Sequence, residues 1–150
     1  MSRQWIQIAP PLQRIAFGAA LQLPAKDRTE GYEILGKFLH QVKLDPAGSS
    51  EFMYQINRPR PSSTGIDDLV INRLAKWAVG ATQRATYTVV PGVPAPTQMA
   101  DVEREFYARL NLDINTSGEF KGELPPDKLL LILEELINIA KELAEKGDIP

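Results

Sequence analysis

The segment from residue 102 to residue 115 alternates apolar and polar side chains more regularly than any other part of the chain. Its apolar positions are Val102, Phe106, Ala108, Leu110, Leu112 and Ile114, and its polar positions are Glu105, Tyr107, Arg109, Asn111, Asp113 and Asn115. Successive side chains of a strand point to opposite faces of a sheet. The segment is therefore a predicted strand with one buried face and one face in water. A sheet with one buried face needs helices or a second sheet packed against that face.

Two earlier segments have the same period of two, residues 12–23 and a segment that opens at Glu51. Their large apolar residues are Ile15, Phe17, Leu21 and Leu23 in the first segment, and Phe52, Tyr54 and Ile56 in the second. We predict that the odd face of the first strand points inward. Its even positions hold small residues, which either admit a helix or another chain at close range or form a partly exposed face. Pro59 and Pro61 end the second strand because proline has no N–H to donate.

Residues 66–88 fit two patterns. As a helix they place Ile66, Leu69, Val70, Leu74, Trp77, Ala78 and Ala81 on one stripe, and as a strand they place Leu69, Ile71, Ala75, Trp77 and Val79 on one face. Arg73 interrupts both patterns. The β-branched content and the short glycine-containing link to the preceding strand favour a strand, which we predict to bend near Gly80. The proline-rich segment 91–101 then serves as a connection.

Apolar residues recur at the spacing of a helix in two segments. Residues 29–43 form the first predicted helix, with N-cap oxygens on Asp27 and Thr29 and an end at Asp45-Pro46. The second is C-terminal, with Pro126 at its first position and Gly147 as its C-cap. Its apolar residues cover roughly half of the circumference, which is wider than packing on one sheet requires. The extra width is explained either by packing within the chain or by a subunit interface.

The order of elements is therefore strand, helix, three strands and helix. We predict an α+β fold with an antiparallel sheet of about four strands and a long C-terminal helix packed on one face. The length of 150 residues is that of one domain, residues 1–150. The layout resembles, in outline, oligomeric chaperone-like binding proteins.

Composition excludes several kinds of chemistry. With no cysteine there is no disulfide, thiolate ligand or cysteine nucleophile, and the single histidine, His40, excludes a multi-histidine metal site. No nucleophile elbow and no glycine-rich phosphate loop is present. We therefore expect no enzyme activity, no metal and no cofactor; a deep pocket containing Asp113 or His40 would favour an enzyme instead. No signal peptide or membrane span is evident, so we expect a cytoplasmic protein without a membrane partner.

A repeated tripeptide is the main candidate for a binding surface. Ile56-Asn57-Arg58 recurs as Ile71-Asn72-Arg73, and a hairpin centred near residues 64–65 would place the two copies almost opposite each other. Basic and aromatic residues gather around them, while the C-terminal helix exposes one leucine on its acidic face. The predicted partner-binding residues are Arg58, Arg60, Arg73, Lys76, Trp77 and Leu131.

This cluster has three interpretations. Its arginines and asparagines are structural, or bind an acidic protein surface, or grip a nucleic acid. We expect a non-enzymatic protein-interaction module of the adaptor, assembly or chaperone-like kind, associating with a protein partner or with itself through the C-terminal helix or a sheet edge. The alternative is a nucleic-acid or ribonucleoprotein subunit. Its contacts would be Arg58, Arg60, Arg73, Lys76 and Arg84.

Overall fold

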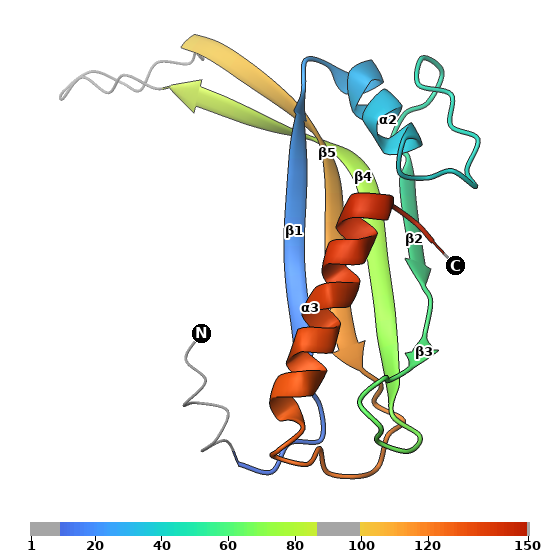
Figure 1. The fold of residues 1–150 in the computed structure, drawn as a ribbon. Helices are drawn as coiled ribbons and strands as arrows, with labels where there is room; N and C mark the ends of the chain where they lie inside the picture. Colours follow the sequence, from blue (N-terminus) through green and yellow to red (C-terminus); the bar gives the residue numbers. More distant parts are fainter. Residues whose placement is uncertain (1–9, 87–99, 150) are drawn as a thin grey trace, which may run out of the picture.

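The protein is described by a computed structural model that covers residues 10–86 and 100–149. One antiparallel sheet carries two helices on the same face (Figure 1). The strands are β1 (Ala16–Ala25), β2 (Met53–Asn57), β3 (Arg60–Pro61), β4 (Val70–Thr86) and β5 (Ala100–Thr116), and the helices are α2 (Arg28–Gly36) and α3 (Leu129–Lys146). The predicted α+β fold is confirmed. The sheet has five strands because Arg60-Pro61 adds a short strand beside β4.

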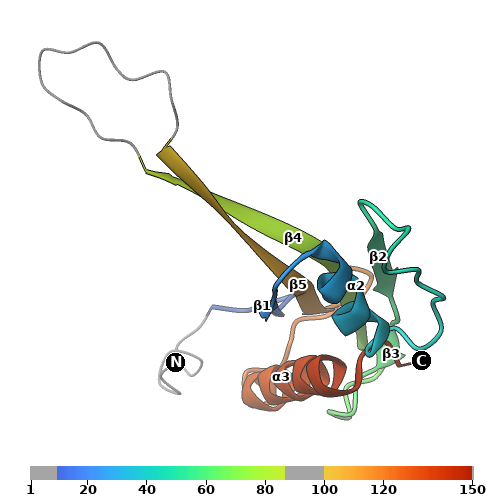
Figure 2. The ribbon, with the colours of Figure 1, turned by 90° about the horizontal axis from the view of Figure 1, so that it is seen from above.

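The strand order is β1-β5-β4-β2, with β3 also paired to β4. Ile56 pairs with Ala75, and Arg60 pairs with Ile71, so the hairpin is centred where the sequence predicted it. Gly65 at its tip has a φ of 72°, a left-handed conformation that glycine adopts without strain. Strands β4 and β5 are longer than their neighbours β2 and β1. Past the ends of those neighbours, β4 and β5 continue to pair with each other as a two-stranded arm that projects from the body (Figure 2).

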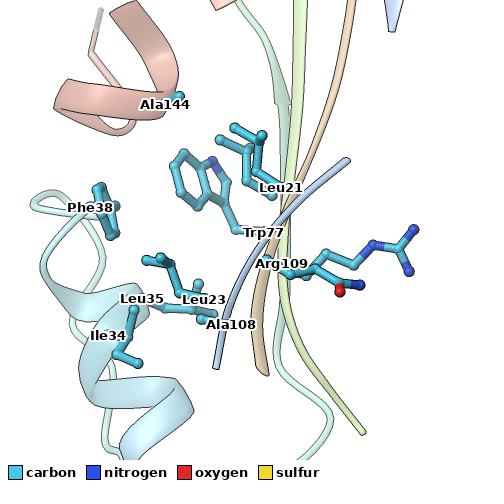
Figure 3. Close-up of a pocket in the computed structure, with 11 residues that line it drawn as sticks. Leu21, Leu23, Ile34, Leu35, Phe38, Trp77, Ala108, Arg109 and Ala144 are labelled. Atoms are coloured by element: carbon cyan, nitrogen blue, oxygen red, sulfur yellow. The ribbon is translucent and has the colours of Figure 1, made fainter. Parts of the chain in front are cut away.

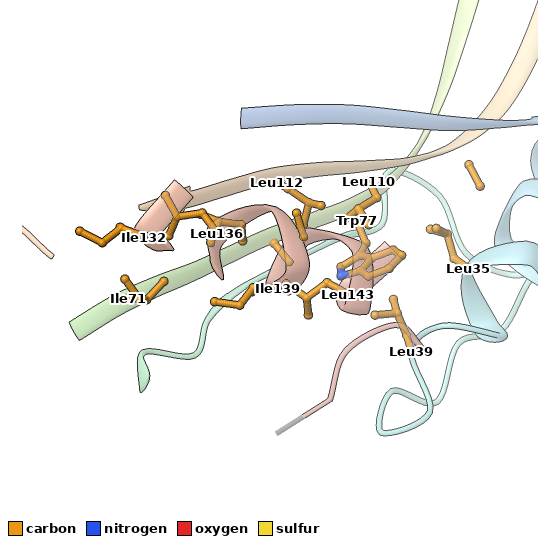
Figure 4. Packing of buried hydrophobic residues seen from close by; sticks show 14 of the residues in the cluster. Leu35, Leu39, Ile71, Trp77, Leu110, Leu112, Ile132, Leu136, Ile139 and Leu143 are labelled. Carbon is orange, nitrogen blue, oxygen red and sulfur yellow. The ribbon is translucent and has the colours of Figure 1, made fainter. Parts of the chain in front are cut away.

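The core lies between the sheet and the two helices (Figure 4). The prediction of a strand rather than a helix is confirmed for Val70–Thr86, whereas residues 66–69 form a turn before β4 and residues 87–88 lie outside the described residues. The odd positions from Ile71 to Trp77 face the helices, with Arg73 buried among the apolar residues. On β5 the predicted alternation is confirmed from Ala108 to Ile114, whereas Asn115, which was predicted to face water, is buried. The buried apolar residues of the two strands and of α3 are Ile71, Ala75, Trp77, Ala108, Leu110, Leu112, Ile114, Leu129, Ile132, Leu136, Ile139, Ala140 and Leu143.

Both helices are shorter than predicted. Helix α2 ends at Gly36 instead of residue 43, because the chain turns there to stack Phe38 on Trp77, with ring centroids 5.7 Å apart. The carbonyl of Phe38 then accepts the N–H of Asp148 at 2.9 Å, which holds the turn against the C-terminal tail. Helix α3 begins at Leu129 rather than at Pro126, after a turn over residues 126–128. The predicted C-cap is confirmed, since the N–H of Gly147 donates to the carbonyl of Leu143.

The proline-rich segment 91–101, predicted to be a connection, lies outside the described residues except for the start of β5.

Within the ranges that the structure covers, no helix has the length and apolarity that crossing a membrane requires.

Candidate interaction surface along β1

The tripeptide asparagines hold the β2–β4 hairpin together. The side-chain N–H of Asn57 donates to Oδ1 of Asn72 at 3.1 Å, and Oδ1 of Asn57 accepts the backbone N–H of Arg73 at 2.9 Å. Asn72 in turn donates to Asn115 on β5 at 3.1 Å. These contacts support the structural interpretation of the repeated tripeptide.

Arg58 binds the C-terminal tail. Its Nε and Nη2 donate to the two carboxylate oxygens of Asp148 at 2.8 and 2.9 Å, and the hydroxyl of Tyr54 donates to the same carboxylate at 2.7 Å. The hydrogen bond from Arg58, with a smaller contribution from Tyr54, holds the pKa of Asp148 below its usual value. The hydrogen bond to Asp148 likewise raises the pKa of Tyr54 and that of Arg58. Arg58 is therefore already engaged within the chain.

Arg73 is buried, with 6% of its surface exposed, and its Nη2 donates to the carbonyl of Ile149 at 3.1 Å. Burial lowers the pKa of Arg73, and the positive charge of Arg60 lowers it further. Arg60 itself lies 3.9 Å from Glu142 of α3. The fold thus gathers three of the predicted arginines beside the end of α3.

The other predicted site residues lie elsewhere. Trp77 is buried in the core, where it stacks on Phe38. Lys76 points to the face without helices, since its neighbours Ala75 and Trp77 are buried under them. Leu131 is 49% exposed on the outer side of α3, and Arg84 lies on the arm. A partner-binding role for these residues stays a prediction, but the structure does not unite them in one surface.

The wide apolar stripe of α3 divides into two rows. Leu129, Ile132, Leu136, Ile139 and Leu143 face the sheet and are buried. One flank is polar, because Glu135 accepts hydrogen bonds from Ser62 and Ser63 and Lys128 donates to the carbonyl of Thr64. At 100° per residue, the opposite flank faces β1. It is apolar and half-buried, and consists of Leu130, Leu133, Ile137 and Ala144.

Strand β1 forms one edge of the sheet and pairs only with β5 in the described structure. The N–H of Thr116 donates to the carbonyl of Ile15, so the odd residues of this segment hydrogen-bond to β5. In an antiparallel pair the intervening residues direct their N–H and C=O groups to the other side. Those residues are Ala16, Gly18, Ala20 and Gln22, followed by Pro24, which has a carbonyl but no N–H.

Exposed leucines lie beside this edge. Leu21 and Leu23 are 43% and 49% exposed, although the sequence predicted an inward odd face. They do point to the helix side, and both helices contact β1, but the helices leave these two leucines uncovered. They line a pocket of about 260 Å³ between β1 and the helices (Figure 3). Its other apolar lining residues are Ile34, Leu35, Phe38, Trp77, Ala108, Leu110 and Ala144.

The two edges of the sheet differ. The β2–β3 edge consists of strands of five and two residues and is interrupted by Pro59, features that discourage pairing with another chain. Strand β1 has ten residues and no charged side chain. We use the name β1 surface for the outward backbone of residues 16–24, Leu21, Leu23 and the apolar flank of α3. The signals for it in the sequence were the small even row and the lack of charge.

His40 and Asp113 are the two residues that the sequence linked to a possible catalytic pocket. Among the described residues no group of three or more His, Cys, Asp or Glu side chains is placed to hold a metal ion. Asp113 lines an open pocket of about 310 Å³ together with Arg14 and Asn115. His40 is exposed in the turn after α2, and Asp113 accepts a hydrogen bond from Asn115 on the face without helices.

Comparisons with protein-family models, with curated proteins and with solved structures give no match.

Proposed function

We propose that this chain is a non-enzymatic protein-interaction module that binds an extended polypeptide segment along the β1 surface. The observation that carries the proposal is a ten-residue edge strand whose outward backbone groups lie beside two exposed leucines and an apolar pocket. Adding a strand to a free edge is a common mode of protein recognition. The backbone supplies hydrogen bonds, and alternate side chains of the added strand supply specificity.

The apolar pocket determines which segments fit. A strand beside β1 directs every second side chain toward the helix face, where Leu21, Leu23 and Phe38 present apolar surface. The pocket lining is largely apolar, so apolar side chains at alternate positions are favoured there. Burying a leucine fully contributes about 1.5–3 kcal/mol. The preferred partner is therefore an uncharged segment with aliphatic side chains at every second position.

The other routes that the sequence suggested receive less support. The sheet-facing row of α3 is buried within the chain, so only its flank is free to contribute to an interface. Nucleic-acid binding through the arginine cluster would compete with the contacts that Arg58 makes to Asp148 and Arg73 makes to Ile149.

The test uses a fluorescently labelled, uncharged ten-residue peptide with leucine at alternate positions, and measures its anisotropy as the protein is added. We expect saturable binding to the wild-type chain. Leu23→Glu should weaken it by about tenfold or more, since about 1.4 kcal/mol corresponds to tenfold. Leu131→Glu is a matched control, because both leucines are 49% exposed and Leu131 lies away from the β1 surface. An equal loss of peptide affinity in the two variants would contradict the proposal. So would a wild-type chain that neither binds the peptide nor associates along β1.

A further inference from the structure

We infer that the segment bound along the β1 surface is strand β1 of a second copy of this chain, antiparallel to the first and centred on Ala20. The inference rests on the proposed function and names its partner. The resulting dimer has one continuous antiparallel sheet. A twofold axis perpendicular to the sheet keeps the helices of both copies on the same face.

The absence of charged side chains allows strand β1 to pair with the same strand of a second copy. None of the residues from Ala16 to Ala25 carries a charged side chain, so two copies meet without like-charge repulsion within the strand. With Ala20 at the centre, the two cationic residues Arg14 and Lys26 come opposite each other only beyond the two ends of the paired strands. Edge strands that avoid self-pairing usually have charged side chains, prolines or short lengths. The β2–β3 edge of this sheet has such features, whereas β1 has a proline only near its end, at Pro24.

Backbone geometry favours Ala20 as the centre. The outward N–H and C=O groups belong to even-numbered residues, so a hydrogen-bonded pair must join two even positions. With Ala20 opposite Ala20, Gly18 lies opposite Gln22, and all of these residues exchange hydrogen bonds. Pro24 lies opposite Ala16, at the end of the ladder, where its missing N–H removes only the last bond.

The same centre matches large side chains with smaller ones. On the helix face it places Leu21 opposite Ala19 of the second copy and Leu23 opposite Phe17. These pairs lie at positions without direct hydrogen bonds, where cross-strand side chains approach most closely. Both exposed leucines are covered, and the apolar flanks of the two α3 helices lie on either side of the seam. On the other face, Ala20 meets Ala20 and Gln22 meets Gly18.

Disulfide trapping tests this arrangement directly, because the natural chain has no cysteine. Hydrogen-bonded antiparallel partners have Cα atoms about 5.5 Å apart, within the range of about 4.4–6.8 Å that a disulfide spans. Oxidised Ala20→Cys should form a covalent dimer. Gly18→Cys and Gln22→Cys should each stay largely uncrosslinked alone but should crosslink when the two proteins are mixed. Leu131→Cys, an exposed position away from β1, is the control.

Light scattering of the untreated wild-type chain separates the possible failures. A dimer together with the predicted crosslinks supports the inference. Two results obtained with a dimer overturn the pairing along β1. In the first, Ala20→Cys crosslinks but the mixture of Gly18→Cys and Gln22→Cys does not. In the second, Leu131→Cys crosslinks as well as Ala20→Cys does. A monomer that binds the leucine peptide overturns the second copy as occupant while the proposed function stands. A monomer that binds no peptide overturns both.

Discussion

At the scale of single residues, the end of the chain depends on Gly147 and Asp148. Gly147 has a φ of 81°, and a Cβ at this position would collide with the carbonyl of Phe38. Asp148 then receives hydrogen bonds from Arg58 and Tyr54. These two residues join the end of α3 to β2 and to the turn after α2, so they close one end of the core.

Replacing Gly147 with alanine should destabilise the fold. The left-handed φ and the collision with Phe38 together should lower the free energy of unfolding by more than about 1 kcal/mol. Gly36→Ala is the matched control, because Gly36 is the last residue of α2 and a Cβ there meets nothing within 4 Å. Alanine at that position should leave stability unchanged or raise it by up to about 1 kcal/mol. Urea denaturation of both variants checks the difference, and an equal change in the two would contradict it.

Replacing Asp148 with asparagine should produce a loss of stability that depends on pH. Removing the charged hydrogen bonds should cost about 1–3 kcal/mol at pH 7. The pKa of Asp148 is lower in the folded state than in the unfolded state, where it is near 3.9. The stability that the Asp148 carboxylate contributes is therefore fully present above the unfolded pKa and is lost as the pH falls through the lower folded pKa. The difference between variant and wild type should therefore shrink below about pH 4. Urea denaturation at pH 7 and pH 3 measures it, with exposed Asp67→Asn as control, and a difference independent of pH would refute this assignment.

At the scale of elements, period and turn chemistry predicted most of the fold. The alternation in β5, the strand β4 and the centre of the β2–β4 hairpin were all evident from local pattern. The end of α2 was not, because it depends on Phe38 stacking on Trp77 and bonding to Asp148, both distant in sequence. The partner of Arg58 was missed for the same reason.

The candidate surface was only partly predictable. The small even row of β1 was consistent either with the close approach of a helix or another chain or with a partly exposed face. The exposure of Leu21 and Leu23 was missed, because their spacing is that of buried strand residues. The exposure of side chains at a sheet edge depends on where the covering helices end. The path of α3 across the sheet cannot be predicted from the local spacing of apolar residues.

The two apolar rows of α3 should respond differently to truncation. Leu136 is fully buried, so Leu136→Ala should lower the free energy of unfolding by about 2–5 kcal/mol. Leu133 lies half-buried on the flank that faces β1, and Leu133→Ala should cost less stability while weakening association. Thermal unfolding and light scattering, measured on the same samples, separate the two effects. A larger loss of stability for Leu133→Ala than for Leu136→Ala would show that the flank belongs to the core.

At the scale of the whole molecule, the two edges of the sheet differ, because β2 and β3 protect one edge and, among the described residues, no strand lies outside β1 at the other. Its helices cover a single face, and the β4–β5 arm projects beyond both edge strands (Figure 2). A symmetric pairing along β1 removes the open edge from both copies at once. The twofold axis then passes midway between the two copies of Ala20, whose side chains lie opposite each other. This symmetry distinguishes pairing between copies from binding of an unrelated strand.

A charge exchange at the axis should reveal that symmetry. Ala20 is exposed on the face without helices, so Ala20→Lys and Ala20→Glu should both fold with thermal stability close to that of the wild type. In each variant alone, two like charges face each other across the seam, which destabilises a cross-strand pair. Each should therefore be more monomeric than the wild type at low salt. Mixing the two should restore the dimer as a heterodimer, and added salt should weaken that rescue because it screens exposed charges. Light scattering and native mass spectrometry of the separate and mixed proteins measure this. If both variants dimerise as well as the wild type does, the two copies of Ala20 do not face each other across the axis.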